Sequence, residues 1–171
     1  MELLIPGLIL VGLMVYASTR IKRTAAEAFN PETVETDDFA IEKPEGFLNV
    51  VRHDPTLAFD AYSKNFGVNG AEEFREARAE IRVFTQRGVR DVIVAIKDTA
   101  NVVSDISEII GERKYHVLET ETTEKGIGFR NLYKVAESGG RVFELKFTVL
   151  EQGGEELTQK VEKMVGSFTV K

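Results

Sequence analysis

The sequence has no cysteine and no tryptophan, and it has only two histidines among 171 residues. Without cysteine the chain forms no disulfide, has no catalytic thiol and offers no cysteine for lipoprotein acylation. Cysteine-free domains occur on both sides of membranes, so the compartment stays open. The histidines, His53 and His116, are far apart in the sequence, and no short metal-ligand spacing surrounds either. Nothing in the sequence predicts a cofactor.

Repeats and low-complexity tracts are also missing, so solenoid and fibrous architectures are excluded. Once an N-terminal segment of roughly thirty residues is set aside, about 140 residues remain, close to the commonest domain size. Residues 24–171 hold 19 basic and 27 acidic side chains, a net charge of −8. That negative field repels phosphate backbones, and we therefore expect no nucleic-acid partner.

One stretch, Leu3–Ala17, lacks charge altogether, and Arg20, Lys22 and Arg23 follow it directly. The pattern is typical of a short transmembrane helix with a cationic collar whose long side chains reach the interface. Because positive charge favours the cytoplasmic side, the collar predicts an N-out, single-pass protein with a cytoplasmic C-terminal domain. The bilayer itself is then a partner.

A cleaved signal peptide is the main alternative for this segment. The apolar run has the length of a signal's hydrophobic region, and residues 15–17 would fit a cleavage site. The domain would then be exported. However, Glu2 is the only charged residue before the run, whereas signal peptides carry positive charge there. A buried core helix is the third reading, and the all-round hydrophobicity argues against it.

The segment after the collar favours a helix to about Phe29, where Asn30-Pro31 stops it. Residues 30–38 are acidic and lack hydrophobic periodicity, which predicts a solvated linker. We therefore expect an anchor with its helical extension at 1–29, a linker at 30–38 and one α+β domain at 39–171.

Within that domain, alternating apolar and polar residues predict a series of strands. The expected strands cover residues 39–43, 47–51, 57–61, 76–83, 114–123, 127–136 and 141–150, with a helical lead-in at 71–74. The last three form an antiparallel meander with short turns. A terminal helix begins near Glu155 and ends at Gly166.

Residues 89–110 fit two descriptions. Their apolar residues fall on one helical stripe that ends at Gly111, which predicts a single long helix. The β-branched run Val92-Ile93-Val94 would also fit a buried strand followed by a helix from Asn101 to Ile110. Both versions place a helix before Gly111. The expected core is a mixed, mostly antiparallel sheet flanked by helices, an αβα sandwich, behind one N-terminal transmembrane helix.

Two segments resemble PsbP-like domains, which share an αβα sandwich with the Mog-type proteins. Phe39-x-Ile-x-x-Pro44-x-Gly46-Phe47 is similar to their opening segment, with Phe47 in place of the usual tryptophan. Residues 115–123, the following hairpin, the terminal helix and residues 167–170 are similar to their ending. The resemblance implies a binding or assembly-support domain that docks on membrane complexes or GTPases. It implies no catalytic residue.

Few side chains suggest chemistry. His53-Asp54 has the composition of a general-base pair, although an exposed turn histidine is the simpler reading. Glu119, Glu121 and Glu124 are weak candidate ligands for a hard cation, which needs six or more oxygen ligands. If this segment is a strand, His116 faces away from Glu119 and Glu121 and cannot complete such a site.

Arg130, Asn131 and Tyr133 are candidates for a ligand or partner groove. The simpler reading pairs Arg130 with a glutamate across the strands.

The sequence therefore favours a membrane-anchored, non-catalytic interaction or assembly-support module whose partner is a membrane or membrane-proximal protein. One alternative is a small-molecule or lipid-binding domain at the membrane surface, with a pocket walled by Phe143, Phe147 and Tyr133. The other is a hydrolase with an unrecognised site.

Overall fold

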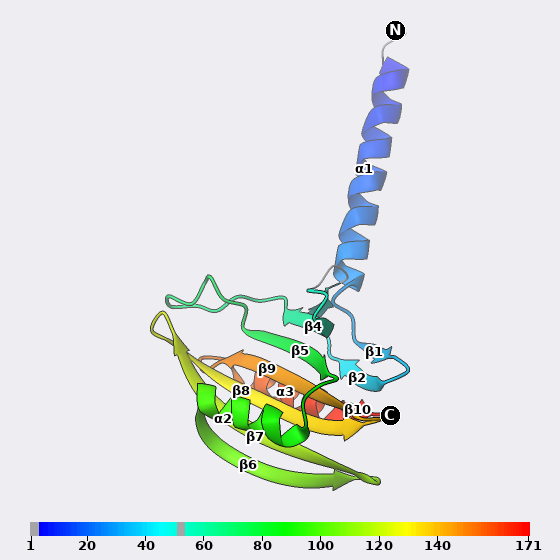
Figure 1. Ribbon diagram of the computed structural model, residues 1–171. Helices are drawn as coiled ribbons and strands as arrows, with labels where there is room; N and C mark the ends of the chain where they lie inside the picture. Colours follow the sequence, from blue (N-terminus) through cyan, green and yellow to red (C-terminus); the bar gives the residue numbers. More distant parts are fainter. Residues whose placement is uncertain (1–3, 51–53) are drawn as a thin grey trace.

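The computed structural model describes residues 4–50 and 54–171, and in this part the chain forms three helices and ten strands (Figure 1). In chain order the elements are α1 (Leu4–Glu27), β1 (Glu32–Glu35), β2 (Phe39–Lys43), β3 (Phe47–Asn49), β4 (Leu57–Ser63), β5 (Ala77–Phe84), α2 (Val89–Thr99), β6 (Asn101–Ile110), β7 (Arg113–Glu124), β8 (Ile127–Ser138), β9 (Arg141–Leu150), α3 (Glu155–Ser167) and β10 (Thr169–Val170).

The strands form two sheets. The large sheet has seven strands in the order β3-β4-β5-β9-β8-β7-β6, and the small sheet has three in the order β1-β2-β10. Every strand pair in the described chain is antiparallel, so the sheet is not mixed as the sequence suggested. The expected meander of β7, β8 and β9 is confirmed.

The helices lie on opposite faces of the large sheet, α2 on one and α3 on the other (Figure 1). Strand β9 shows why. Phe143, Leu145 and Phe147 point into the main core with Val161 and Met164 of α3. Its even-numbered residues point the other way, because successive strand residues alternate between faces. There Val142 joins a smaller core under α2. The helix–sheet–helix layering expected from the sequence is confirmed.

The region 89–110 differs from both sequence descriptions, because the helix comes first and a strand follows. Helix α2 ends at Thr99, and β6 pairs with β7 along its whole length, with one irregularity between Val102 and Ser104. Five of the last nine residues of β6 are valine or isoleucine, which favour strands. Gly111, with a φ of +63°, turns the β6–β7 hairpin instead of ending a helix.

Two shorter segments also differ from expectation. Residues 71–74 form a turn, closed by a hydrogen bond of 2.9 Å from the Phe74 amide to the Ala71 carbonyl, instead of a helical lead-in. The expected linker contains β1, which pairs with β2. A short, exposed edge strand needs little apolar periodicity, since backbone hydrogen bonds hold it, and this is why the sequence pattern missed it.

Helix α1 stands clear of the domain (Figure 1). Where its side chains are described, they are exposed, including five apolar aliphatic ones and Tyr16, at 59 to 68%. Over the described residues, no helix has both the length and the apolar character needed to cross a membrane. The transmembrane helix expected within residues 1–29 stays a prediction.

A buried lysine joins the end of α1 to the domain. The Lys43 side chain is 1% exposed, and its ammonium group donates to the backbone carbonyls of Ala28, Asn30 and Phe47 at 2.6 to 3.2 Å. Burial lowers the pKa of Lys43, and Glu32, at 3.9 Å, opposes that shift. A single side chain thus satisfies carbonyls on both sides of the junction, which fixes the helix end to β2 and β3.

Candidate functional site

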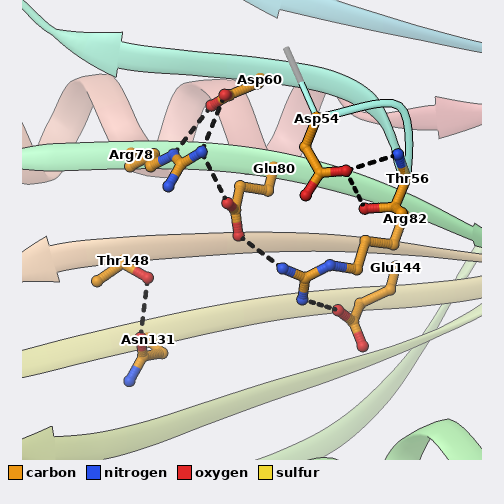
Figure 2. A network of polar contacts seen from close by, with 9 residues as sticks. All are labelled: Asp54, Thr56, Asp60, Arg78, Glu80, Arg82, Asn131, Glu144 and Thr148. Atoms are coloured by element: carbon orange, nitrogen blue, oxygen red, sulfur yellow. Dashed lines mark hydrogen bonds and ion pairs between the residues drawn. The ribbon is translucent and has the colours of Figure 1, made fainter.

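The face of the large sheet that carries α2 is only partly covered. Val92 and Ile96 of α2 pack on Leu118, Tyr133 and Val135 of β7 and β8. Beyond this contact, strands β4, β5 and β9 present a continuous set of charged side chains on the same face (Figure 2). We call this set the polar face, and it consists of Asp60, Arg78, Glu80, Arg82 and Glu144.

The polar face is a chain of ion pairs with alternating sign. Arg78 donates two hydrogen bonds of 2.9 Å to the two carboxylate oxygens of Asp60. The same guanidinium lies 3.1 Å from Glu80, which in turn accepts from Arg82 at 3.2 Å. Arg82 then reaches Glu144 on β9 at 3.6 Å. Three strands are linked in this way (Figure 2).

Burial separates the two signs of charge. The side chains of Asp60, Glu80 and Glu144 are 7, 12 and 7% exposed, whereas those of Arg78 and Arg82 are 48 and 38% exposed. A desolvated carboxylate is costly unless it is paired, and each of these three contacts an arginine. The carboxylates therefore form an inner layer that holds two guanidinium groups at the surface.

Two titrating groups lie where the polar face meets α2. Burial raises the pKa of the Glu144 carboxyl, and Arg82 and Lys146 oppose that shift. Burial also raises the pKa of the Tyr133 phenol, and the negative charge of Glu144 adds to it. A carboxyl with a raised pKa can serve as a general acid. Here, however, it is 7% exposed and paired with an arginine, an arrangement typical of a structural ion pair.

The predicted groove residues do not form one groove. Asn131 and Tyr133 lie on the α2 side of β8, and Arg130 lies on the opposite side, because adjacent strand residues face opposite ways. Asn131 is buried between two threonines, donating to Thr122 at 3.0 Å and accepting from Thr148 at 3.1 Å. Its amide is therefore used within the sheet.

Arg130 forms the ion pair that the simpler sequence reading predicted. Its Nε lies 3.7 Å from Glu119, and Glu121 stands directly opposite it on β7. Glu124 faces the other way from these two glutamates, since it is an odd number of residues from both. Among the described residues, no group of three or more histidine or acidic side chains is placed to hold a metal ion.

The histidines and the collar add little to the site. His53 lies outside the described residues, and His116 contacts Ser107 Oγ through Nδ1 at 3.2 Å. His116 lies opposite Val135, on the face away from Glu119 and Glu121, as the sequence predicted. Arg20 is exposed on α1, whereas the side chains of Lys22 and Arg23 lie outside the described part.

The apolar pocket considered for a lipid or small molecule is not formed by its expected walls. Phe143 and Phe147 are fully buried in the core under α3, whereas Tyr133 lies on the other face of the sheet. The alternation that separates Arg130 from its neighbours also separates these three aromatic residues.

Sequence reasoning missed all five residues of the polar face. The alternation of Arg78, Glu80 and Arg82 on β5 identified a strand face, but it did not show that this face is part buried. The usable signal was the alternation of charge sign at every second residue. The partners Asp60 and Glu144 depend on the registers of β4 and β9, which one strand does not encode.

Comparison with solved structures shows the fold. Cyanobacterial PsbP from Synechocystis sp. PCC 6803 is 10% identical, with a TM-score of 0.58 over 84% of this chain and 94% of that protein. LpqN of Mycobacterium tuberculosis, described as involved in cell envelope biogenesis, is 11% identical, with 0.58 over 82% and 90%. A single-site mutant of the protein Mog1 is 11% identical, with 0.53 over 82% and 96%.

A protein from Bacteroides thetaiotaomicron also matches, at 15% identity and a TM-score of 0.51, and the chain spans 45% of its length. No protein-family profile and no curated protein sequence matches. The chain therefore has the PsbP/Mog-like fold, as its two resembling segments implied. At these identities the similarity establishes the architecture alone.

Proposed function

We propose that this protein is a non-catalytic interaction domain attached to a membrane by α1, and that the polar face is where a membrane or membrane-proximal protein docks. The observation that carries the proposal is a pair of arginines, 48 and 38% exposed, held by three carboxylates that are at most 12% exposed. Arginine is enriched at the centres of protein interfaces. A side chain that is already immobilised loses little conformational entropy on binding.

Ion pairing favours binding over catalysis at this face. A nucleophile or general base must be free to accept a proton or attack a substrate. In the described chain the three carboxylates of the polar face are each within 3.6 Å of a guanidinium nitrogen. The fold is also that of LpqN and cyanobacterial PsbP, and one of these is described through envelope biogenesis, not through a reaction.

The exposure of α1 supports attachment to a membrane. Val11, Leu13 and Val15 are about 60% exposed on a helix that stands clear of the sheets (Figure 1). Exposed apolar side chains such as these are unfavourable in water and favourable in lipid. The basic residues at its C-terminal end favour the cytoplasmic side for the domain.

Docking is tested on the full-length protein in detergent extracts, by photo-crosslinking and pull-down. The Arg78→Lys/Arg82→Lys variant keeps the charges but loses the paired, planar hydrogen-bonding geometry of guanidinium. We expect it to recover the specific partner at least about tenfold less well, a loss of about 1.4 kcal/mol or more. The control is Arg90→Lys on the exposed side of α2. Equal recovery by all three proteins would overturn the docking site.

Attachment is tested by carbonate extraction of membranes. We expect the unaltered protein to stay in the pellet and a Leu13→Lys/Val15→Lys variant to move to the supernatant. Val94→Lys, at an exposed apolar position of α2, should behave like the unaltered protein. Release of the unaltered protein by carbonate would contradict attachment through α1.

The missing cysteines make sidedness simple to measure. A Glu162→Cys variant carries one thiol, on the exposed side of α3. We expect a membrane-impermeant maleimide to label it in lysed but not in intact cells. Labelling in intact cells would place the domain outside and overturn the predicted orientation.

A further inference from the structure

Strand β6 is one edge of the seven-stranded sheet, and it is long and exposed. It has ten residues and pairs only with β7 in the part of the chain that the structure describes. Val103, Ile106 and Ile109 are 52, 56 and 75% exposed. A long apolar edge leaves a row of backbone donors and acceptors that another strand can pair with.

The other edges of the two sheets are much shorter. Strand β3 at the opposite end of the large sheet has three residues, and β1 and β10, the edges of the small sheet, have four and two. Short edges offer few hydrogen bonds to another chain, which is a common protection against edge pairing. Strand β6 has neither this protection nor a proline, lysine or arginine within it.

The two acidic residues of β6 do not protect it either, because lysines of the same chain pair with them. Asp105 contacts Lys97 of α2 at 2.5 Å, and Glu108 lies 3.3 Å from Lys134 of β8. The molecule carries a net charge of −6, yet this edge is locally neutral. Two copies can therefore approach along it without the repulsion that exposed carboxylates would cause.

We propose that β6 pairs antiparallel with β6 of a second copy of this chain, joining two large sheets into one. Two identical antiparallel edge strands are related by a two-fold axis perpendicular to the sheet, which preserves its faces. Opposed residues then lie an even number of positions apart or coincide. One such register is centred on Ile106, and it sets Ser104 opposite Glu108 and Asp105 opposite Ser107.

This register is self-complementary. Each carboxylate lies opposite a serine hydroxyl, and the two Ile106 side chains pack against each other across the axis. Centring on Asp105 instead would oppose two carboxylates, and centring on Ser107 would oppose Ile106 to Glu108. Cross-strand pairs are worth several tenths of a kcal/mol each, and like charges in opposition are unfavourable. The sequence of β6 thus suits a second β6 better in one register than in its neighbours.

The register predicts a specific crosslink in the full-length protein. Because the chain has no cysteine, Ile106→Cys places one thiol opposite its own symmetry mate. Directly opposed Cβ atoms on antiparallel strands lie ~4.5–5.5 Å apart, close to disulfide distance. We expect mild oxidation to give a covalent dimer within detergent-solubilised protein. Val94→Cys on α2, similarly exposed, should give no covalent dimer in the same conditions.

A second variant separates β6 pairing from association through α1. Because Ile106 is 56% exposed, the Ile106→Lys variant should fold normally. In the dimer, its two lysine ammonium groups would face each other at the two-fold axis. We expect at least about a tenfold rise in the dimer dissociation constant by light scattering, or about 1.4 kcal/mol, with an unchanged circular dichroism spectrum. A monomeric unaltered protein, equal crosslinking at positions 94 and 106, or a dimer unaffected by Ile106→Lys would each overturn the proposal. Capture of a different chain at β6 in place of a second copy would also overturn it.

Discussion

The two faces of the large sheet are built from the same strands but differ in composition and in cover. On the α3 side, Ile81, Leu145 and Phe147 belong to one continuous apolar core. On the α2 side the core is smaller, and charged side chains occupy the remaining area. Because successive side chains of a strand point to opposite sides, each strand contributes to both faces of the sheet. Mutation of the two faces should therefore separate the residues that stabilise the fold from those available for recognition.

The largest expected effect is on the α3 side. Phe147 is fully buried and stacks edge-on with Phe47 at 6.5 Å between ring centroids. Phe147→Ala should lower the free energy of unfolding by about 3–5 kcal/mol, because it removes buried contacts and leaves a cavity. Urea unfolding measures this. Lys146→Ala, on the other face of the same strand, should cost under about 1 kcal/mol; similar losses for both would contradict the division between the faces.

A smaller effect is expected when the polar face is broken. Arg78→Ala leaves Asp60 without both of its hydrogen bonds, in a nearly buried position. A fully buried pair would cost ~3–5 kcal/mol to break, but Arg78 is about half exposed, so we expect a loss of about 1–2 kcal/mol.

A double-mutant cycle with Asp60→Asn shows whether this loss belongs to the pair. The double variant should be less destabilised than the sum of the two single ones, because no unpaired carboxylate is left. Strict additivity would mean that the two side chains do not interact, and the polar face would then be a set of independent surface charges.

The smallest effect is expected at Glu144, and it depends on pH. Its pKa is raised in the folded protein, so the folded state binds this proton more tightly than the unfolded state, where the value is near 4.5. The stability contributed by this group is present below that value and is lost as pH rises through the folded pKa.

Glu144→Gln mimics the neutral form and removes this dependence. Relative to the unaltered protein, its stability should match below pH 4.5 and be higher by under about 1 kcal/mol near neutral pH. Thermal unfolding between pH 4 and 8 measures the difference. If Glu144→Gln were instead less stable than the unaltered protein near neutral pH, the ion pair with Arg82 would outweigh the cost of burying the carboxylate.

Sequence patterns predicted the elements with strong local periodicity. The alternation in β7, β8 and β9 and the apolar stripe of α3 agree with the structure. The order of helix and strand within 89–110 was wrong, since valine and isoleucine at exposed positions of β6 fit a helical stripe equally well. Pairing with β7, which only the tertiary fold sets, decides between helix and strand here.

The candidate site was harder to predict from the sequence than the fold. Strand alternation alone would have separated Arg130 from Asn131 and Tyr133. In contrast, Asp60 meets Arg78 and Arg82 meets Glu144 only through the registers of three strands that are distant in the chain. Long-range register depends on packing and turn geometry together, so the polar face could not be assembled from local patterns.

The hydrogen bonds of the buried Lys43 ammonium group have a mechanical consequence. A helix of 24 residues is about 36 Å long, and just beyond its end the carbonyls of Ala28 and Asn30 accept hydrogen bonds from the ammonium group of Lys43 on β2. A hinge at this point would have to break these two hydrogen bonds and uncover the buried ammonium group. A tilt of α1 that leaves these bonds intact rotates the whole domain with it. The direction of α1 then sets the direction in which the polar face points.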